Sequence, residues 1–344
     1  MMRFSSRPVG RFAGRCRVKP LAFCLWLVGC LASPALFGQV TAIPDPAFEQ
    51  ALIDLGIDSD SVLNGQVATA DVRGVTALNV SSRDIADLTG LADFDSLTSL
   101  NCSLNRLQVL DLAQNALLEV LVCNSNRLTA LDLSGNPRLT MLLCSSNRLQ
   151  AVDFSVVPEL GFLDCSANLL PDIDVSALDS LENLNCSGNR LQVLDLSANL
   201  LLRDLSCGGN QLQQLDLSGS DSLGSLVCLG NQLRVLALPT SGRLGTVNCA
   251  DNLLNSLNFS QDTLLTSLNC SGNRLQYLNL KNGKNALLRE LNATDNPLLT
   301  CIVVDDPAAP GDNWQKDNAA NWSADCPPLR TFVPDDNFEQ ALID

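Results

Sequence analysis

Apolar and polar residues alternate over two short stretches in each successive block of 21 residues along most of the chain. In LNCSGNRLQVLDLS (184–197), Leu184 and Cys186 alternate with Asn185, and the half VLDLS repeats the same alternation. A period of two predicts a strand with one buried face. Each block should therefore contribute two short strands, which form two parallel ladders on opposite sides of a flattened coil.

Ten consecutive blocks cover residues 97–304, and nine of them have the form LxxLxCxxNxLxxLDLSxNxx. The ninth block carries a two-residue insertion around KNGKN. One block buries too little apolar surface to offset the conformational entropy lost on ordering it, so the blocks must stack and cover one another. The two ends of such a stack need caps.

This repeat resembles that of bacterial secreted leucine-rich repeat proteins, in the 21-residue form with a second LxxLDLS half nested in each unit. The resemblance implies a repeat solenoid, a leucine-rich repeat coil with parallel β ladders on both faces. It also implies a C-terminal cap over residues 305–330. Proteins of this kind bind partners on the concave strand surface, so the same surface is the expected binding site here.

A short helix is predicted before the repeats, within an N-terminal cap and irregular first repeats spanning residues 39–96. In IPDPAFEQALIDLG, Asp45 is the expected N-cap, Pro46 the first helical residue and Gly56 the stop. This helix should cover the first coil. The following DSDSVLNGQVATAD, from Asp58, partly matches a calcium loop, but Val62 occupies a ligand position, which favours an ordinary turn.

Asparagine recurs once in every block, at positions 105, 126, 147, 168, 189, 210, 231, 252, 273 and 296. We interpret this column as inward-turned amides that satisfy backbone groups where the chain leaves the strand. The alternative is carbohydrate attachment at NCS sequons such as those of Asn101, Asn185 and Asn269.

Cysteine occupies an inward strand position in nine blocks, at 102, 123, 144, 165, 186, 207, 228, 249 and 270. Stacked coils place equivalent atoms about 4.8 Å apart, so the thiols form a line and do not converge on one zinc ion. We expect free, buried thiols that pack as small hydrophobic groups. Disulfides along the column are the alternative, because the Cα separation permits them.

Cys301 and Cys326 break the 21-residue period and flank a segment that has no repeat. We predict a disulfide between them, which closes this loop over the last coil. The resemblance to leucine-rich repeat proteins implies that the segment is the C-terminal cap.

Residues 1–38 contain six basic and no acidic residues, and the basic leader is followed by the apolar run LAFCLWLVGCLASPALFG. This pattern is typical of a bacterial signal peptide and predicts a secreted or cell-surface protein. An uncleaved membrane anchor is a weaker alternative, because the run contains Pro34 and is only 18 residues long. The third interpretation is a lipoprotein box, LVGC, in which lipidation of Cys30 attaches the protein to a membrane.

Removal of the leader leaves 16 basic against 37 acidic residues and changes the formal charge from −15 to −21. Nucleic acid is therefore excluded as a partner, because phosphate binding requires basic surface.

Six aspartates form one outward column in the second halves of successive blocks. Neighbouring carboxylates in such a column repel one another, so they need hydrogen bonds from serines, ion pairs or cations. No cofactor is expected except weakly bound Ca²⁺. These aspartates are at 111, 132, 153, 174, 195 and 216.

The final residues TFVPDDNFEQALID (331–344) match TAIPDPAFEQALID (41–54) at ten of fourteen positions. The cap helix therefore begins a second time. We expect residues 331–344 to start a second copy of the module in a tandem array.

Small polar residues occupy most outward positions beside the inward leucines, but the second to fourth blocks depart from this rule. An apolar patch with a charged rim is typical of an interface. Drift in a tolerant repeat and cover by a neighbouring module are the alternatives. The patch is Val120, Val122, Met141, Leu143 and Phe162, and its rim includes Asp164, Glu182, Arg203 and Asp204.

Catalysis is not expected, because the sequence contains no histidine, the commonest general base. We therefore predict a non-catalytic module that binds another protein, or failing that a glycan, at the cell surface or in an adhesive matrix. A structural spacer and a targeting module of a larger enzyme are the alternatives.

Overall fold

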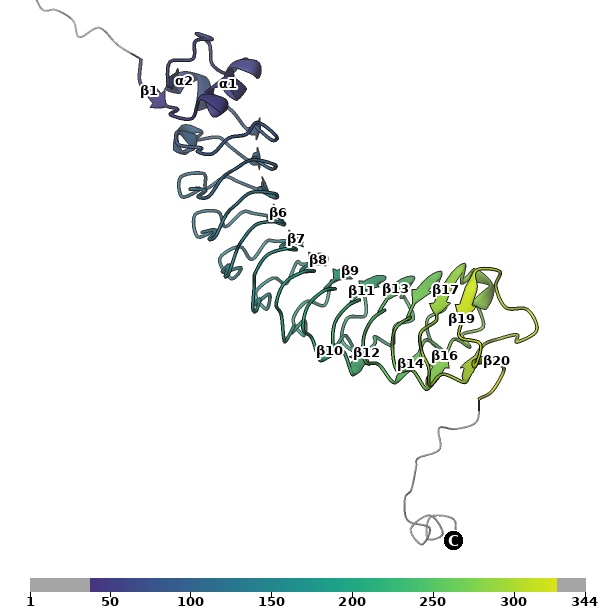
Figure 1. Cartoon of the computed structure of the whole chain (residues 1–344). Coiled ribbons are helices and arrows are strands. Elements are labelled where there is room, and N and C mark those ends of the chain that lie inside the picture. The colour runs from purple at the N-terminus through teal and green to yellow at the C-terminus, as the bar shows by residue number, and fades with distance from the viewer. Residues whose placement is uncertain (1–37, 327–344) are drawn as a thin grey trace, which may run out of the picture. The chain divides into compact units, whose positions relative to one another are not determined.

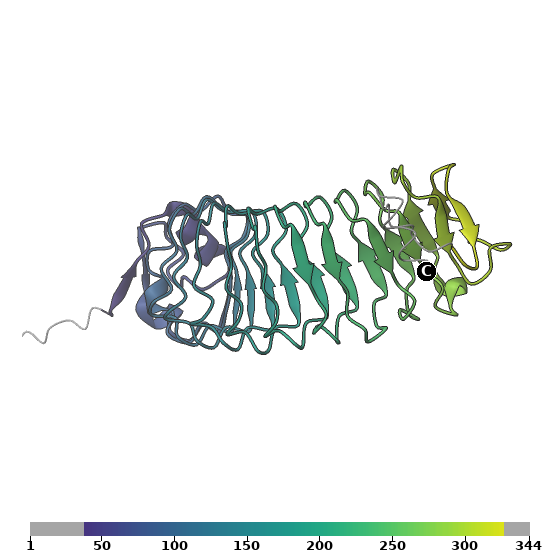
Figure 2. The same cartoon turned by 90° about the horizontal axis from the view of Figure 1, so that it is seen from below.

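The computed structural model describes residues 38–326, which form a solenoid of stacked coils (Figure 1). Its main sheet contains twelve parallel strands in chain order, one from each coil (Figure 2). The strands are β3 (Ala77–Asn79), β4 (Ser99–Asn101), β5 (Val120–Val122), β6 (Met141–Leu143), β7 (Phe162–Asp164), β8 (Asn183–Asn185), β9 (Asp204–Ser206), β11 (Ser225–Val227), β13 (Thr246–Asn248), β15 (Ser267–Asn269), β17 (Glu290–Ala293) and β19 (Trp314–Lys316).

A second ladder lies on the opposite side of the coils, as predicted, but only in the C-terminal half. In earlier coils the equivalent Leu110 and Leu112 are buried without forming a strand. The main sheet follows the inner side of the bend (Figure 1). Coils that are joined by backbone hydrogen bonds only on the inner side can lie further apart on the outer side, which bends the stack. The second ladder comprises β10 (Gln214–Asp216) with β12 (Val235–Ala237), and then β14 (Ser256–Asn258), β16 (Tyr277–Asn279), β18 (Cys301–Val303) and β20 (Asn321–Ser323).

Leucine and cysteine columns fill the interior of the coils. The inward residues of the main strands from Leu100 to Leu291 are at most 3% exposed, and the nine periodic cysteines are 0% exposed. Each coil covers the apolar edge of its neighbour, so the columns form one continuous core. The burial pattern confirms the predicted direction of both alternating stretches.

The periodic asparagines connect consecutive coils. Asn126 donates through Nδ2 to the backbone oxygens of Cys102, one coil earlier, at 3.0 Å and of Cys123 at 3.1 Å. Its Oδ1 accepts from the backbone N–H of Leu107 at 2.9 Å. The same three contacts recur along the column, for example at Asn147. The interpretation of these residues as inward-turned amides is confirmed.

A second, less regular column of buried polar residues follows the LDLS halves. Asn199 donates through Nδ2 to the backbone oxygens of Val175 and Leu178 in the preceding coil, both at 3.0 Å. Asp262 occupies the equivalent position and is 2% exposed. Its Oδ1 has no hydrogen-bond partner among the described residues. Burial raises the pKa of Asp262 to about 6.

The N-terminal cap contains the predicted helix, α1 (Pro46–Asp54), whose Phe48 and Leu52 are fully buried. β1 (Val40–Ala42) pairs antiparallel with β2 (Gln66–Ala68), and the single turn α2 (Thr69–Val72) follows. These elements cover the first coil (Figure 1). Two 3₁₀ turns, η1 (Leu91–Asp93) and η2 (Asn285–Leu287), lie in the connections.

Asp45 is the N-cap of α1, as predicted, and also ties the cap to the repeats. Its Oδ1 accepts from the backbone N–H groups of Ala47 at 2.8 Å and Phe48 at 3.3 Å. Its Oδ2 accepts from those of Ala86 at 2.7 Å and Asp87 at 2.9 Å. Partial burial opposes ionisation, but these four donors together lower the pKa of Asp45.

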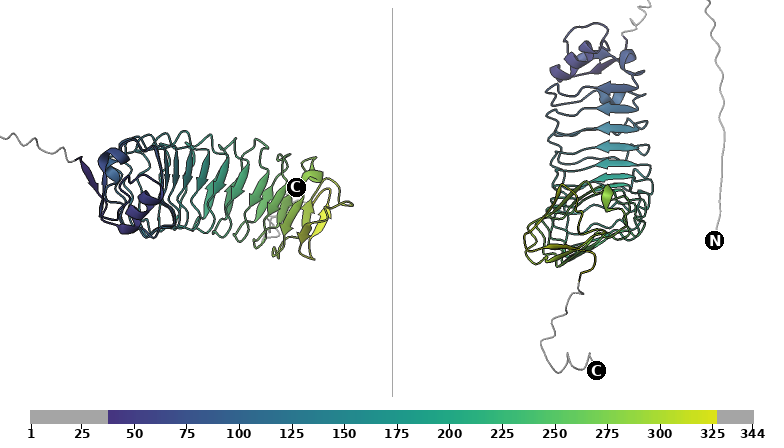
Figure 3. Two further views of the ribbon diagram at one scale, coloured as in Figure 1. Left: turned by 90° about the horizontal axis from the view of Figure 1, so that it is seen from above. Right: turned by 90° about the vertical axis from the view of Figure 1, so that its right-hand side faces the viewer.

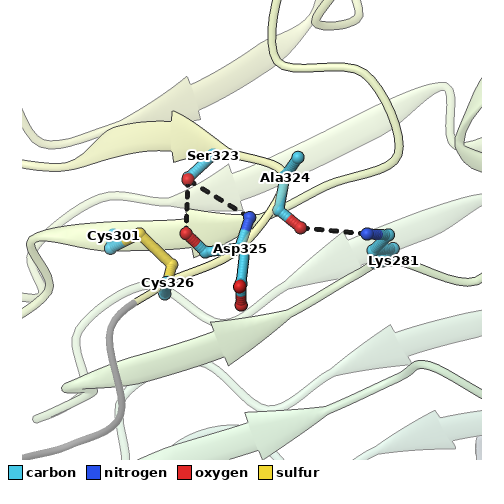
Figure 4. The surroundings of a disulfide bond; sticks show 6 residues. All are labelled: Lys281, Cys301, Ser323, Ala324, Asp325 and Cys326. Atoms are coloured by element: carbon cyan, nitrogen blue, oxygen red, sulfur yellow. Dashed lines mark hydrogen bonds between the residues drawn. A yellow bond between two sulfur atoms is a disulfide. The ribbon is translucent and has the colours of Figure 1, made fainter.

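The C-terminal end is closed by the predicted disulfide between Cys301 and Cys326, with Cα atoms 5.9 Å apart (Figure 4). Lys281 donates to the backbone oxygen of Ala324 at 3.0 Å beside it. Trp314 and Trp322 occupy the inward positions of the last coil, with their rings 5.4 Å apart. The disulfide therefore holds the final strand over the two tryptophans, which close the end of the hydrophobic core.

The predicted leader, apart from Gly38, and the predicted second module (331–344) lie outside the described residues, as does the lipidation proposed at Cys30. The domain boundaries therefore remain predictions. Within residues 38–326, no helix is long and apolar enough to cross a membrane.

Replacing Asn147 with alanine should lower the free energy of unfolding by about 3 kcal/mol, because three buried hydrogen bonds between its side-chain amide and the backbone disappear. Asn183→Ala is the matched control, since that amide points outward from β8. Urea denaturation of both variants measures the difference. Equal midpoints for the two variants would show that the asparagine column does not stabilise the stack.

Asp262→Asn should stabilise the protein at neutral pH, because the amide stays neutral and can donate as Asn199 does. The folded pKa of about 6 lies above the ordinary value of 3.8. The folded state therefore binds more protons, and the wild type should lose about 2–3 kcal/mol as pH rises from 4 to 7. Denaturation midpoints across this range should fall for the wild type and fall less for the variant. An equal change of midpoint with pH in both proteins would contradict the raised pKa of Asp262.

Candidate functional site

The face of the main sheet that points away from the core is here called the concave face, and Figure 3 shows the succession of strands that carries it. Strand register places Val120, Met141 and Phe162 opposite one another on β5, β6 and β7. The same register places Val122 opposite Leu143, and Leu143 opposite Asp164. The five apolar residues therefore lie together on three adjacent strands, and we call them the apolar strip.

All five residues of the apolar strip are half-buried. Adjacent strands are about 4.8 Å apart, so each side chain covers the flank of the next and leaves its tip exposed. The backbone beneath them is held by sheet hydrogen bonds on both sides. The strip is thus a rigid apolar surface with little conformational entropy to lose on contact with a partner.

The predicted charged rim lies mainly on one side of the apolar strip, on the next two coils. Arg203 Nε is 3.4 Å from Glu182 Oε2, and both side chains are largely exposed. Such a pair contributes little to stability. Asp204 is exposed, and Asp164 accepts from the backbone N–H of Ser166 at 3.0 Å. The rim therefore carries an excess of negative charge and is not a closed ring.

No protein-family model matches this sequence. No curated protein matches it either. Among solved structures, the functional domain of InlJ from Listeria monocytogenes, which includes a cysteine ladder, has a TM-score of 0.61 and 27% identity. That match covers 81% of this chain and 70% of the Listeria chain. The chain is a leucine-rich repeat solenoid.

Two further solved structures share the leucine-rich repeat fold. A leucine-rich repeat protein of Leptospira interrogans has a TM-score of 0.56 at 19% identity, over 74% of this chain and 79% of that chain. A plant peptide hormone receptor, RGFR1, solved in complex with RGF2, has a TM-score of 0.56 at 21% identity. It matches 69% of this chain and 45% of the receptor.

The nine cysteines of this leucine-rich repeat chain are free and buried, as predicted, and no disulfide joins them. Burial raises the pKa of Cys102, Cys228 and Cys270 to about 12. Burial also raises the pKa of the other six, and for each of these a neighbouring thiol adds to the effect. Because the thiolate is the reactive form, the column acts as packing and offers no nucleophile.

The loop that partly matches a calcium loop is a turn held by its own side chains and by Glu49 of α1, which accepts from the backbone N–H groups of Asn64 and Gly65, both at 2.8 Å. Asp60 accepts from the backbone N–H of Val62 at 2.8 Å and from Asn64 Nδ2 at 2.9 Å. Val62 is 54% exposed. Within residues 38–326, no group of three or more acidic, cysteine or histidine side chains converges as a metal site.

Five of the six outer aspartates of the leucine-rich repeats are hydrogen-bonded by serines, which was one of the predicted arrangements, and Asp111 accepts from the backbone N–H of Ala113. Asp174, for example, accepts from Ser176 through Oγ at 2.6 Å and through the backbone N–H at 3.0 Å. Such hydrogen bonds lower the pKa of Asp132, Asp174, Asp195 and Asp216. These four aspartates are therefore ionised at neutral pH and face solvent. The amides of the last coils form a second polar surface, which no sequence signal distinguished from the other outward polar residues.

The buried thiols should resist modification in the native protein. With iodoacetamide at pH 8 and no reductant, none of the nine column cysteines should be labelled, because burial holds them protonated and out of contact. In guanidinium without reductant all nine should react, while Cys301 and Cys326 stay blocked. Peptide mass mapping distinguishes these sets. Rapid labelling of the folded protein would contradict the buried column.

Proposed function

We propose that this leucine-rich repeat solenoid is a non-catalytic binding module that contacts another protein through the apolar strip. The observation that carries the proposal is the register of β5, β6 and β7, which brings five apolar side chains together on a surface whose other outward residues are mostly polar. A contiguous apolar group on a rigid sheet with a charged flank suits a protein interface.

The charge of the rim indicates what kind of protein surface fits. Glu182 pairs with Arg203, which leaves Asp164 and Asp204 beside the apolar strip. A partner with exposed apolar side chains flanked by lysine or arginine would complement both features. The fold itself is compatible with such a role, since the plant receptor of the same fold was solved in complex with RGF2.

We further propose that the module acts outside the cell. The support is the basic and apolar leader in residues 1–38 and the similarity to the Listeria domain. More specifically, we propose that the module takes part in adhesion to a cell or matrix. Attachment to a membrane would require lipidation at Cys30.

Catalysis by this chain has little support. Its nine periodic thiols are buried with raised pKa values, and its sequence has no histidine. A spacer that holds other modules apart is the second candidate, since tandem copies are predicted by the match of residues 331–344 to 41–54.

The double variant Met141→Asp, Phe162→Asp should lose binding to the physiological partner by at least tenfold, because it places two charges in the contact. Photo-crosslinking of the protein in the natural environment of the organism that produces it identifies the partner. Titration of the purified pair then measures the dissociation constant. The matched control is Val109→Asp with Val193→Asp, whose side chains are 75% and 68% exposed away from the main sheet.

The control should bind as the wild type does, and both double variants should keep the wild-type circular dichroism spectrum. If the variant Met141→Asp, Phe162→Asp binds every partner that the wild type binds, the apolar strip is not the interface and the spacer candidate gains support.

A further inference from the structure

The C-terminal coils of the concave face carry two parallel columns of polar side chains that are separate from the apolar strip. Strand register aligns β13, β15, β17 and β19, so that equivalent outward residues lie side by side. Three strands, β8, β9 and β11, separate β13 from the apolar strip. One column is Thr246, Ser267 and Glu290, continued by Asn313 directly before β19; the other, here called the amide column, is Asn248, Asn269, Asn292 and Gln315.

The three asparagines of the amide column have their orientation fixed by the backbone. The Oδ1 atoms of Asn248, Asn269 and Asn292 each accept from the backbone N–H two residues later, at 3.2 Å. This Asx turn occupies the acceptor end of each amide. The Nδ2 donors must then point away from the turn, and among residues 38–326 they donate to no acceptor.

The members of both columns on the last three coils, but not Thr246 and Asn248 of β13, line a hollow of about 470 Å³ on the concave face. This volume lies in the range that holds a small ligand or one segment of a longer one. Its outward lining is entirely polar, and the leucines beside it belong to the buried core. The outward side chains are Ser267, Asn269, Glu290, Asn292, Asn313 and Gln315.

The chemistry of this lining selects a ligand class. The amide nitrogens donate, the exposed carboxylate of Glu290 accepts, and Ser267 Oγ lies 3.5 Å from Glu290 Oε2. Hydroxyl groups both donate and accept, so a chain of hydroxyls matches a surface on which donors and acceptors alternate. Anionic ligands are disfavoured, because Glu290 is the charged residue among those that line the hollow.

We propose that the amide column is a binding subsite for a neutral oligosaccharide, which lies across β13, β15, β17 and β19. Adjacent strands repeat the donor group about every 4.8 Å along this direction, so one extended saccharide can meet several equivalent amides. This site is independent of the apolar strip and of the proposed protein partner.

The test is titration of the protein, cut after its leader, with neutral hexasaccharides of glucose, xylose, mannose and N-acetylglucosamine, and with an anionic oligogalacturonate. At least one neutral hexasaccharide should bind and should shift the side-chain amide NMR signals of Asn269 and Asn292. The oligogalacturonate should bind more weakly. Absence of binding by all four neutral sugars, or preference for the anion, would overturn the proposal.

The variant Asn269→Asp, Asn292→Asp keeps the Oδ1 acceptor of each turn and replaces the Nδ2 donors with acceptors. It should weaken saccharide binding at least tenfold with an unchanged denaturation midpoint. Asn185→Asp is the matched control, because Asn185 makes the same turn on β8, accepting from Ser187 N–H at 3.2 Å. The apolar-strip variant should bind the saccharide normally, which separates this result from the outcome for the protein partner. Equal affinity of wild type and double variant would exclude the amide column.

Discussion

Hydrogen bonding between consecutive coils is the interaction on which the rest of this structure depends. The strand groups of a coil pair with the neighbouring coils and not within the coil itself. The main sheet pairs each three-residue strand with the next coil, and the asparagine column, of which Asn126 is typical, pairs the turn groups that the sheet leaves open. Because the strand pairs, and two of the three asparagine contacts, join one coil to its neighbour, stability belongs to the stack and the ends require caps. Asp45 and the Cys301–Cys326 disulfide close those two ends.

The same constraint explains why cysteine recurs without chemistry. The position of each thiol is enclosed between coils, where a small apolar group fits and a larger one would separate the strands. Ala293 fills it in the tenth unit with the same complete burial. The raised pKa values of the thiols follow from this enclosure. Outward positions are free of the constraint, so they can vary from coil to coil and carry binding groups.

The two proposed binding surfaces arise on one sheet because register is preserved along it. An apolar residue on one coil is always beside the equivalent residue of the next, so a local run of substitutions becomes a continuous patch. The apolar strip on β5–β7 and the amide column on β13–β19 are two such runs. They differ in chemistry, one suited to an apolar and basic protein surface and the other to hydroxyl groups.

The sequence by itself determined which residues point inward, because a strict period fixes side-chain direction locally. Leu184, Cys186 and Asn189 are buried as their columns predict, and the cap helix and disulfide follow equally local signals. Only the tertiary structure decided where the second ladder begins, that Asp262 is a buried acid without a partner at Oδ1, and which way the amides of Asn269 and Asn292 face. These features depend on the spacing between coils and on hydrogen bonds within the assembled stack, and a pattern of residue types contains neither distance nor orientation.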